Sequence, residues 1–394
     1  MSEEFINWLQ SNGARFPKLK IIKTTDNYRS VYTVNLIDRG ELICYIPVKC
    51  IITKEYSKNC EWVKMLESKG YYFHNEHDLL ALSLLYEKKL GKSSFWSHYI
   101  SSLPKEFPTN PVFFSTEDLE KMKGSGAYDK VIEKLNELNL SYEILNKLEP
   151  EIQFSREEYI WARTIVITRV FGFKVNGVQE SGLVPLADML NHQHPDQVNT
   201  SWSFNDKLRG FVISSTSKIK NGVEVFDTYG KKCNYRFFVN YGFFLDNIRN
   251  DEEVVMNINN IKYQLLFRLR PHLEKDRYAN MITLGELIKK LTETMTINDC
   301  LQLIKKSCEE KLNELPVFSV PQSEKERIMK RMVSSEHQLV KDILYFSTFC
   351  LDIYEKISEN PNNKKSITKK AKTKCRSFYV HEIDYFLDKY IIKM

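Results

Sequence analysis

The hydrophobic pattern near the start of the chain is typical of one short helix followed by strands. Residues 5–16 place Phe5, Trp8 and Leu9 on one side of a predicted helix. Residues 31–37 are then rich in β-branched and aromatic side chains, and residues 42–46 resume this composition after a break that contains a glycine. Two such runs separated by a glycine-containing turn predict a β-hairpin.

A long helical region follows this small β unit. Leucines crowd residues 79–85, which predicts a buried helix, and helical patterning continues through 116–147. Ser155 and Glu158 have the spacing of a capping box, so a further helix is expected to begin there and to run to about residue 171.

Strand patterns return at 210–215 and 223–226, so β units flank the helical insert. Beyond about residue 250 the pattern is helical throughout. Apolar residues at spacings of three or four form one stripe from Ile297 to Leu315, and residues 339–354 repeat it. Each stripe must be buried against another element, so several together predict an all-α domain at this end of the chain.

Composition agrees with an ordered protein of about two domains. The chain has 394 residues, of which 42% are hydrophobic and 12% aromatic. The net charge is only +6, and the clearest basic cluster is the Lys-rich segment 364–376. We interpret this segment either as a solvated loop or as a docking patch for an acidic surface such as RNA or chromatin; nothing else in the chain requires nucleic acid.

The cysteines indicate a reducing compartment. All eight are scattered without a Cys-x-x-Cys pair, the sequence starts without an apolar signal segment, and no apolar run reaches the length of a membrane span. We therefore expect a cytoplasmic or nuclear protein with free thiols, no zinc and no membrane contact.

Three motifs in the second half of the chain carry the candidate chemistry. They are Leu183-Val-Pro-Leu-Ala-Asp-Met-Leu-Asn-His192, Phe226-Asp-Thr-Tyr-Gly230 and Asn240-Tyr-Gly-Phe-Phe244. Each one alone is common in loops and strand ends, but their order is specific. The ordered set resembles the C-terminal half of a SET-domain methyltransferase of the branch typified by the Rubisco large-subunit lysine methyltransferase.

The resemblance implies an α+β fold and an activity. Residues 1–250 are expected to form a SET-type β-fold split by a helical insertion at about 54–181. Residues 251–394 are expected to form the helical substrate-binding domain of that branch, with the Lys-rich segment 364–376 inside it. The implied function is S-adenosylmethionine-dependent methylation of a lysine in a protein substrate by a monomeric enzyme without a metal.

The resemblance also assigns roles to individual residues. Tyr229 matches the catalytic tyrosine. Asn191 and His192 match the pair that holds the cofactor, and Asp188 helps to fix their loop. Arg169 matches an arginine near the cofactor carboxylate. The remaining matches are Tyr241 and Phe243 beside the cofactor, and Phe171, Ala187 and Tyr241 along the substrate channel.

Lysine methylation needs a neutral amine, and this requirement explains the residue types. A free lysine has a pKa of about 10.4, so its deprotonation at neutral pH costs roughly 4–5 kcal/mol. An apolar, aromatic-walled channel with a few oriented oxygens lowers that pKa and aligns the nitrogen. A plain core role competes for Phe171 and Phe243, and His192 with His194 is too small a set to indicate a metal site.

One branch of the family methylates a histidine of actin instead. It carries a tryptophan immediately before the motif aspartate and an asparagine two residues after the arginine. This chain has Ala187 and Phe171 at those places, which favours lysine as the acceptor. A protein-histidine methyltransferase of the same family remains the alternative.

The cofactor loop near the N-terminus departs from the family pattern. The family usually has Gly-x-Gly before the first strand, where the backbone approaches the cofactor. This chain has Asn27-Tyr-Arg-Ser-Val31 there, with Asn27 and Arg29 as the candidate contacts. Either the loop takes another path or the cofactor binds more weakly. A catalytically inactive SET-like protein-binding module is therefore a second alternative.

Overall fold

A computed structural model describes residues 3–23, 28–148, 153–230, 232–245, 252–267, 284–364, 366–367 and 369–370. The chain divides into two compact units: 1–107 with 134–231, and 108–133 with 232–394. Asn27 and the Lys-rich segment beyond residue 370 lie outside the described residues. The predicted division into 1–250 and 251–394 stays a prediction; in the structure, residues 108–133 belong to the second compact unit.

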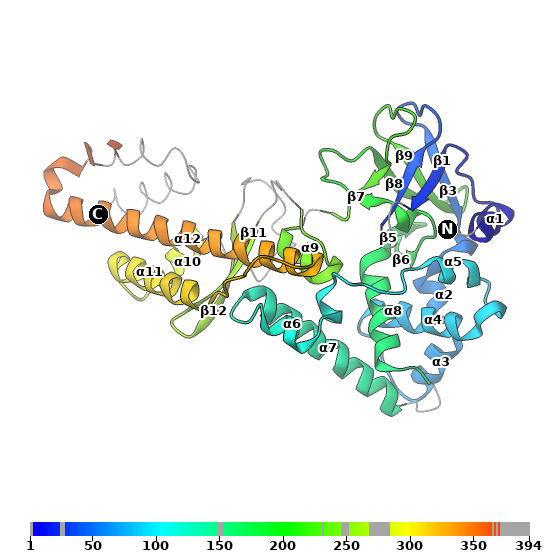
Figure 1. Ribbon diagram of the computed structural model, residues 1–394, viewed down its shortest axis with the longest axis horizontal. Helices are drawn as coiled ribbons and strands as arrows, with labels where there is room; N and C mark the ends of the chain where they lie inside the picture. Colours follow the sequence, from blue (N-terminus) through cyan, green and yellow to red (C-terminus); the bar gives the residue numbers. More distant parts are fainter. Residues whose placement is uncertain are drawn as a thin grey trace. The chain divides into compact units, whose positions relative to one another are not determined.

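The strands of the first unit form small sheets (Figure 1). One is the antiparallel pair β1 (Leu19–Lys23) and β2 (Arg29–Thr33). The second has the order β3 (Leu42–Pro47), β9 (Gly210–Ser215), β8 (Thr200–Asn205). The third has the order β4 (Ile52–Thr53), β6 (Val178–Leu183), β5 (Val170–Val175). The last is the short parallel pair β7 (Asn191–His192) and β10 (Phe226–Asp227).

The hairpin predicted from residues 31–37 and 42–46 is wrong. Strand β2 pairs with β1, and β3 pairs with β9, far along the chain. The physical reason is visible at the break itself. The Gly40 N–H donates to the Ser215 carbonyl, and the Glu41 N–H donates to Ser215 Oγ at 3.1 Å. The turn is therefore held by the end of β9 and not by the strand before it.

Most helices of the first unit lie below its sheets in Figure 1, and α1 lies beside the strands. Their bounds are α1 Glu3–Ser11, α2 Lys54–Lys58, α3 Glu61–Ser68, α4 Glu76–Leu90, α5 Ser97–Ser102 and α8 Arg156–Arg169. The predicted buried helix is α4, where residues 79–85 are all buried. The predicted capping box of Ser155 and Glu158 opens α8. Because β5 follows α8 directly, Arg169 at the end of this helix lies next to β5, the edge strand of the third sheet.

The second unit is mainly helical, as predicted, but it also contains an unpredicted hairpin. Its elements are α6 Thr116–Glu120, α9 Asn234–Tyr241, β11 Glu252–Ile258, β12 Ile261–Phe267, α10 Leu284–Leu291, α11 Ile297–Glu314 and α12 Glu324–Glu359. Helix α7 (Gly126–Leu148) begins in this unit and ends in the first. The expectation of helices throughout from residue 250 is wrong for 252–267. There, Asn259 and Asn260 both adopt positive φ, the geometry of a tight hairpin turn.

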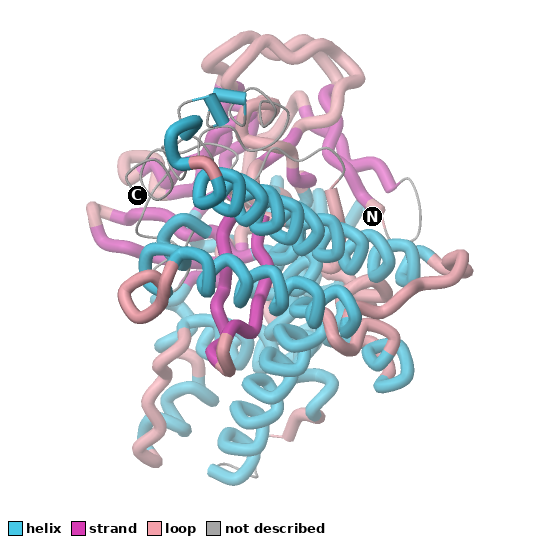
Figure 2. Tube along the Cα trace, turned by 90° about the vertical axis from the view of Figure 1, so that its left-hand side faces the viewer, coloured by secondary structure: helices cyan, strands magenta, loops and turns pink. Residues whose placement is uncertain are grey.

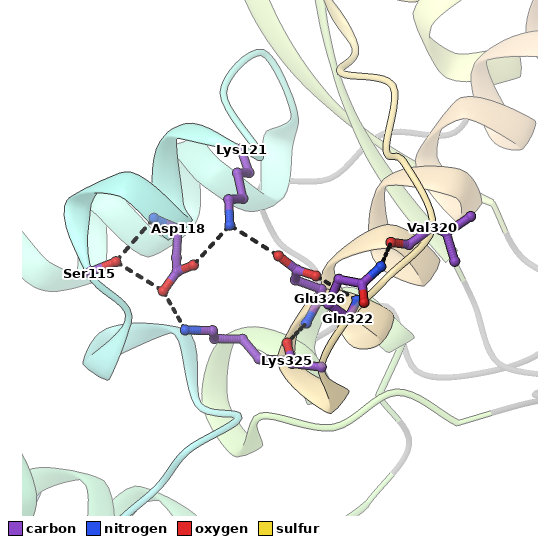
Figure 3. Close-up of polar contacts among 8 residues, drawn as sticks. Ser115, Asp118, Lys121, Val320, Gln322, Lys325 and Glu326 are labelled. Atoms are coloured by element: carbon purple, nitrogen blue, oxygen red, sulfur yellow. Dashed lines mark hydrogen bonds and ion pairs between the residues drawn. The ribbon is translucent and has the colours of Figure 1, made fainter.

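The second unit is built around helix α12. Helix α11, capped by Thr296 as predicted, packs along it, and the β11–β12 hairpin lies against both (Figures 1 and 2). An ion-pair cluster joins α6 to the start of α12 (Figure 3): Asp118 binds Lys325, and Lys121 binds Asp118 at 3.3 Å and Glu326 at 3.1 Å. These contacts explain why residues 108–133 belong to this unit.

Candidate functional site

Two of the sequence motifs meet in the first unit. Strands β7 and β10 run parallel, with Asn191 opposite Phe226 and His192 opposite Asp227. Beyond the end of β10, the backbone N–H of Tyr229 donates to Nδ1 of His192 at 2.9 Å. Since Nδ1 accepts this bond, the proton of the neutral imidazole lies on Nε2. His192 therefore holds the backbone that carries Tyr229.

The hydroxyl of Tyr229 is also oriented. It donates to the backbone carbonyl of Leu190 at 3.1 Å, and the tyrosine ring lies 5.1 Å from the His192 ring. Both partners belong to the segment that contains the Asn-His pair. The predicted catalytic tyrosine and the predicted cofactor pair thus lie together, although about forty residues separate them in the chain.

The turn before the Asn-His pair is strained. Leu186 has φ +70° and is almost fully buried. A non-glycine residue in this region costs on the order of 1–3 kcal/mol and persists only where packing enforces it. The strained residue leads into a short 3-10 helix, Ala187–Met189, in which Ala187 and Asp188 are buried. The turn therefore places the carboxylate of Asp188 inside the unit.

Asp188 is the centre of a buried polar cluster. Its Oδ2 accepts from the Tyr99 hydroxyl at 2.9 Å and lies 3.3 Å from the Arg169 guanidinium, which also donates to the Asp188 backbone carbonyl at 2.6 Å. Burial raises the pKa of Asp188, and Arg169 opposes that rise. Burial and the nearby charge of Arg169 both lower the pKa of Arg29, which Asp188 raises. Arg29, Arg169 and Asp188 thus form one electrostatic group.

Part of this cluster lacks a partner. The Nε–H of Arg169 and Oδ1 of Asp188 are buried, and neither has a hydrogen-bond partner among the described residues. Buried donors are seldom left unpaired in folded proteins, because each costs about 1–3 kcal/mol. A buried arginine donor without an acceptor is a fitting place for an anionic ligand.

The side chain of Asn191 is anchored from its nitrogen. Nδ2 donates to the Arg29 carbonyl at 2.9 Å, to Ser30 Oγ at 3.0 Å and to Glu224 Oε1 at 2.8 Å. Arg29 therefore contributes twice: its backbone meets Asn191, and its side chain reaches the Ser102 carbonyl. The predicted candidates Arg29, Arg169, Asp188, Asn191, His192 and Tyr229 all lie in this one unit.

Phe171 lies in an aromatic cluster. Its ring is 5.3 Å from Trp202 and 5.0 Å from Phe211, and it is buried. Trp202 Nε1 donates to Asp227 Oδ1 at 3.1 Å. Burial raises the pKa of Asp227 to about 6. Whether Phe171 and Ala187 line a substrate channel stays a prediction.

We expect the change Asp227→Asn to stabilise the protein above pH 6. A carboxyl with a folded pKa of about 6 and an unfolded pKa near 3.9 makes ionisation unfavourable for folding. The stabilising contribution of the protonated Asp227 carboxyl is complete below about pH 4 and is lost as the pH rises through about 6. Asparagine should therefore raise the free energy of unfolding by up to about 3 kcal/mol at pH 8, and by nothing near pH 4.

Urea unfolding of the first unit between pH 4 and pH 8 measures this difference. The control Asp38→Asn changes an exposed carboxylate whose nearest cation, Lys218, is 3.9 Å away, so its effect should be small and flat. A pH-independent effect of Asp227→Asn would contradict the account of this carboxyl.

The third motif lies in the second unit. Tyr241 ends helix α9, and Phe243 stacks on Phe237 at 5.0 Å. Gly242 between them has φ +76°, and a Cβ there would approach the Asn110 backbone to 2.7 Å, so the motif needs glycine at this place. The roles of Tyr241 and Phe243 beside the cofactor stay predictions, and Asn27 lies outside the described residues.

Sequence reasoning missed four members of the site: Tyr99, Glu224, Asp227 and Trp202. Asp227 had a signal, because it lies two residues before Tyr229 in a motif already singled out. Tyr99 and Trp202 had none, because they reach the site from α5 and β8 through tertiary packing.

Within the described ranges, no three His, Cys, Asp or Glu side chains are grouped so that they could hold a metal ion. Over the same ranges, no helix has both the length and the apolar character needed to cross a membrane.

This arrangement of residues lies within a region that matches a known protein family. The family model described as "SET domain" matches residues 29–230, just over half of the chain. The chain belongs to the SET domain family. The match begins at Arg29 in β2 and ends at Gly230, directly after Tyr229. It therefore contains the whole group of Arg29, Arg169, Asp188, Asn191, His192 and Tyr229.

Curated relatives of this SET-domain chain have a named activity. This chain is 25% identical over 260 residues to the actin-histidine N-methyltransferase of Homo sapiens and 26% identical to that of Gallus gallus. In both cases the alignment covers 63% of this chain and 43% of the relative. The chain thus matches less than half the length of these relatives.

Solved structures establish the fold. A crystal structure of the SET domain of LSMT bound to lysine and AdoHcy matches with a TM-score of 0.70 at 15% identity, covering 88% of this chain and 90% of that one. A structure of Rubisco LSMT bound to AdoMet matches with a TM-score of 0.67 at 16% identity, covering 89% and 92%. The predicted α+β fold with a SET domain and a helical C-terminal region is confirmed.

Proposed function

We propose that this chain transfers a methyl group from S-adenosylmethionine to a lysine side chain of a protein. The observation that carries the proposal is the bond from the Tyr229 N–H to His192 Nδ1 at 2.9 Å. It joins the tyrosine motif to the Asn-His motif, and an unpaired Arg169 donor is buried close by in the same unit. The relatives named as methyltransferases and the LSMT structures support this proposal.

The residues present fit such a cofactor. Arg169 offers a buried Nε–H, with Arg29 beside it, to a carboxylate. The three hydrogen bonds of Asn191 use its nitrogen, which leaves Oδ1 to accept from an ammonium group. When bound, S-adenosylmethionine supplies a methyl group on a positively charged sulfur.

The chain contributes positioning and desolvation. The acceptor amine must lose a proton, at a cost of roughly 4–5 kcal/mol for a free lysine at neutral pH. A water-poor site reduces this cost, because it disfavours the charged ammonium. The Tyr229 hydroxyl, held by the Leu190 carbonyl, would orient the acceptor nitrogen toward the methyl group of a bound cofactor.

Two residue types compete as the acceptor of the methyl group: lysine and histidine. Ala187 is small and Phe171 is an aromatic residue in a buried cluster, and these residues suit a slim alkyl chain. Histidine is the second candidate, favoured by the curated relatives, which are actin-histidine N-methyltransferases. Methyl transfer to two peptides of the same sequence, one with a central lysine and one with a central histidine, distinguishes these acceptors. We expect methyl transfer to the lysine peptide.

The same proposal covers the partners and the compartment. We expect a protein substrate recognised through the helical C-terminal region, a monomeric chain without a metal, and a cytoplasmic or nuclear location.

Calorimetry with S-adenosylmethionine tests the proposal against an inactive SET-like binding module. We expect one ligand per chain with a dissociation constant of about 1 μM to 1 mM, the range in which enzyme KM values commonly fall. Absence of binding at the top of this range would overturn the enzyme proposal.

We expect His192→Ala to lower kcat by about 10-fold while the affinity for the cofactor changes less, because the Tyr229 backbone loses its acceptor. His194→Ala is the matched control: its Nδ1 also accepts a backbone N–H, from Asp196 at 3.3 Å, but not that of Tyr229. Steady-state kinetics on both variants check the difference. Equal losses would contradict the positioning role of His192.

A further inference from the structure

One acidic side chain helps to set the orientation of the Asn191 amide. Of the three acceptors around Nδ2, the Arg29 carbonyl and Ser30 Oγ come from β2, and Glu224 supplies the only carboxylate. The shortest of the three bonds, 2.8 Å, goes to Glu224 Oε1. The carboxylate and the Arg29 carbonyl can both accept but not donate, so together they hold the nitrogen end of the amide.

Glu224 is itself held in place. Its carbonyl accepts from Asn199 Nδ2 at 3.0 Å, and its backbone bridges to Tyr32. The next residue, Val225, donates its N–H to Val31 at 2.7 Å. This segment therefore lies alongside β2. Glu224 also faces Tyr28, whose pKa is raised by burial and by the charge of Glu224.

The charged groups of the site form two sides. On one side, Arg29 and Arg169 outnumber the Asp188 carboxylate; on the other side lie Glu224 and the Asn191 amide. Arg29 belongs to both sides, because its backbone carbonyl accepts from Asn191. This arrangement matches an α-amino acid, which carries a carboxylate and an ammonium on one carbon.

We propose that Glu224 is a positioning residue that turns the Asn191 amide so that Oδ1 receives the ammonium of the cofactor's amino-acid portion. This inference rests on the proposed function. It assigns to Glu224 a role in recognising one charged group of the ligand, which differs from a general role in folding.

A ligand-and-variant cycle tests the assignment by calorimetry, without any need for turnover. S-adenosylhomocysteine is compared with its analogue that lacks the α-amino group, on the wild type and on Glu224→Leu. Removal of the amino group should weaken binding to the wild type by at least about 10-fold, the lower end of the range for a hydrogen bond to a charged group. On Glu224→Leu, the amide loses the shortest of its three bonds and is held less firmly by the Arg29 carbonyl and Ser30 Oγ. The same removal should then change affinity by less than about 3-fold.

In the conservative variant Glu224→Gln, the Arg29 carbonyl still holds Nδ2 and the glutamine oxygen can accept from it, so this variant should restore the wild-type ratio of the two ligands. A purely structural role would weaken both ligands alike and leave the ratio unchanged in every variant; that result overturns the inference, as does a wild type that binds both ligands equally. A wild type that binds neither S-adenosylmethionine nor S-adenosylhomocysteine overturns instead the proposed function.

Discussion

Replacing Tyr229 with phenylalanine should lower kcat for methyl transfer by about 100-fold or more, while the affinity for the cofactor stays nearly unchanged. The hydroxyl is oriented by its bond to the Leu190 carbonyl, and the backbone of the residue is fixed by His192. Loss of one oriented polar group in a water-poor site typically costs 100- to 1,000-fold in rate. The phenyl ring keeps the shape of the site, so the loss should appear in the chemical step.

The matched control for this variant is Tyr45→Phe. Its hydroxyl also donates to a backbone carbonyl, that of Leu208 at 2.7 Å, but in the β3–β9 region and not at the motifs. Single-turnover rates for both variants measure the difference. Undiminished methyl transfer by Tyr229→Phe would refute the catalytic role of Tyr229, and an equal loss in Tyr45→Phe would show a general effect of removing such a hydroxyl.

The change Arg169→Met should both weaken the cofactor site and destabilise the first unit. The side chain of Asp188 is fully buried beside Arg169, and a buried charge that loses its partner typically costs 3–5 kcal/mol; we expect about 3 kcal/mol here. Without Arg169, the pKa of Asp188 should rise further, because burial already raises it and Arg169 opposes that rise. The loss of stability should thus be largest at neutral pH and shrink in acid, as Asp188 becomes protonated.

Loss of the same guanidinium should weaken binding of S-adenosylmethionine by about 30-fold, since a charge-assisted hydrogen bond contributes roughly 2 kcal/mol. Arg156→Met is the control, because Arg156 begins helix α8 at its opposite end, is exposed and lies 3.9 Å from Glu157. Urea unfolding and calorimetry measure the two effects. Full stability with unchanged binding in Arg169→Met would contradict the role of this arginine.

Much of the fold was predictable because its signals are local. The structure confirms the predicted capping box at Ser155, the leucine-rich helix α4 and the cap at Thr296, because each depends on residues a few positions apart. The hairpin expected from residues 31–46 failed because β3 finds its partner in β9, more than 160 residues later. The hairpin β11–β12 was overlooked because the helical stripes after it dominated the pattern.

The candidate site shows the same difference between local signals, which the sequence reveals, and long-range contacts, which it does not. The order of the three motifs carried the resemblance to the SET family, and the family match of residues 29–230 confirms that membership. What the motifs could not reveal is how they are joined. The bond from Tyr229 to His192, the buried pair of Arg169 and Asp188, and the contact of Glu224 with Asn191 all connect residues that are far apart in the chain.

Mass spectrometry of a cell lysate incubated with this protein and isotope-labelled S-adenosylmethionine tests the central claim most directly. We expect the labelled methyl group on a lysine of at least one protein, with the label absent when Tyr229→Phe replaces the wild type. Label on histidine would contradict the proposed acceptor while preserving methyl transfer. No labelled protein above the Tyr229→Phe background would contradict the claim that this chain is a protein methyltransferase.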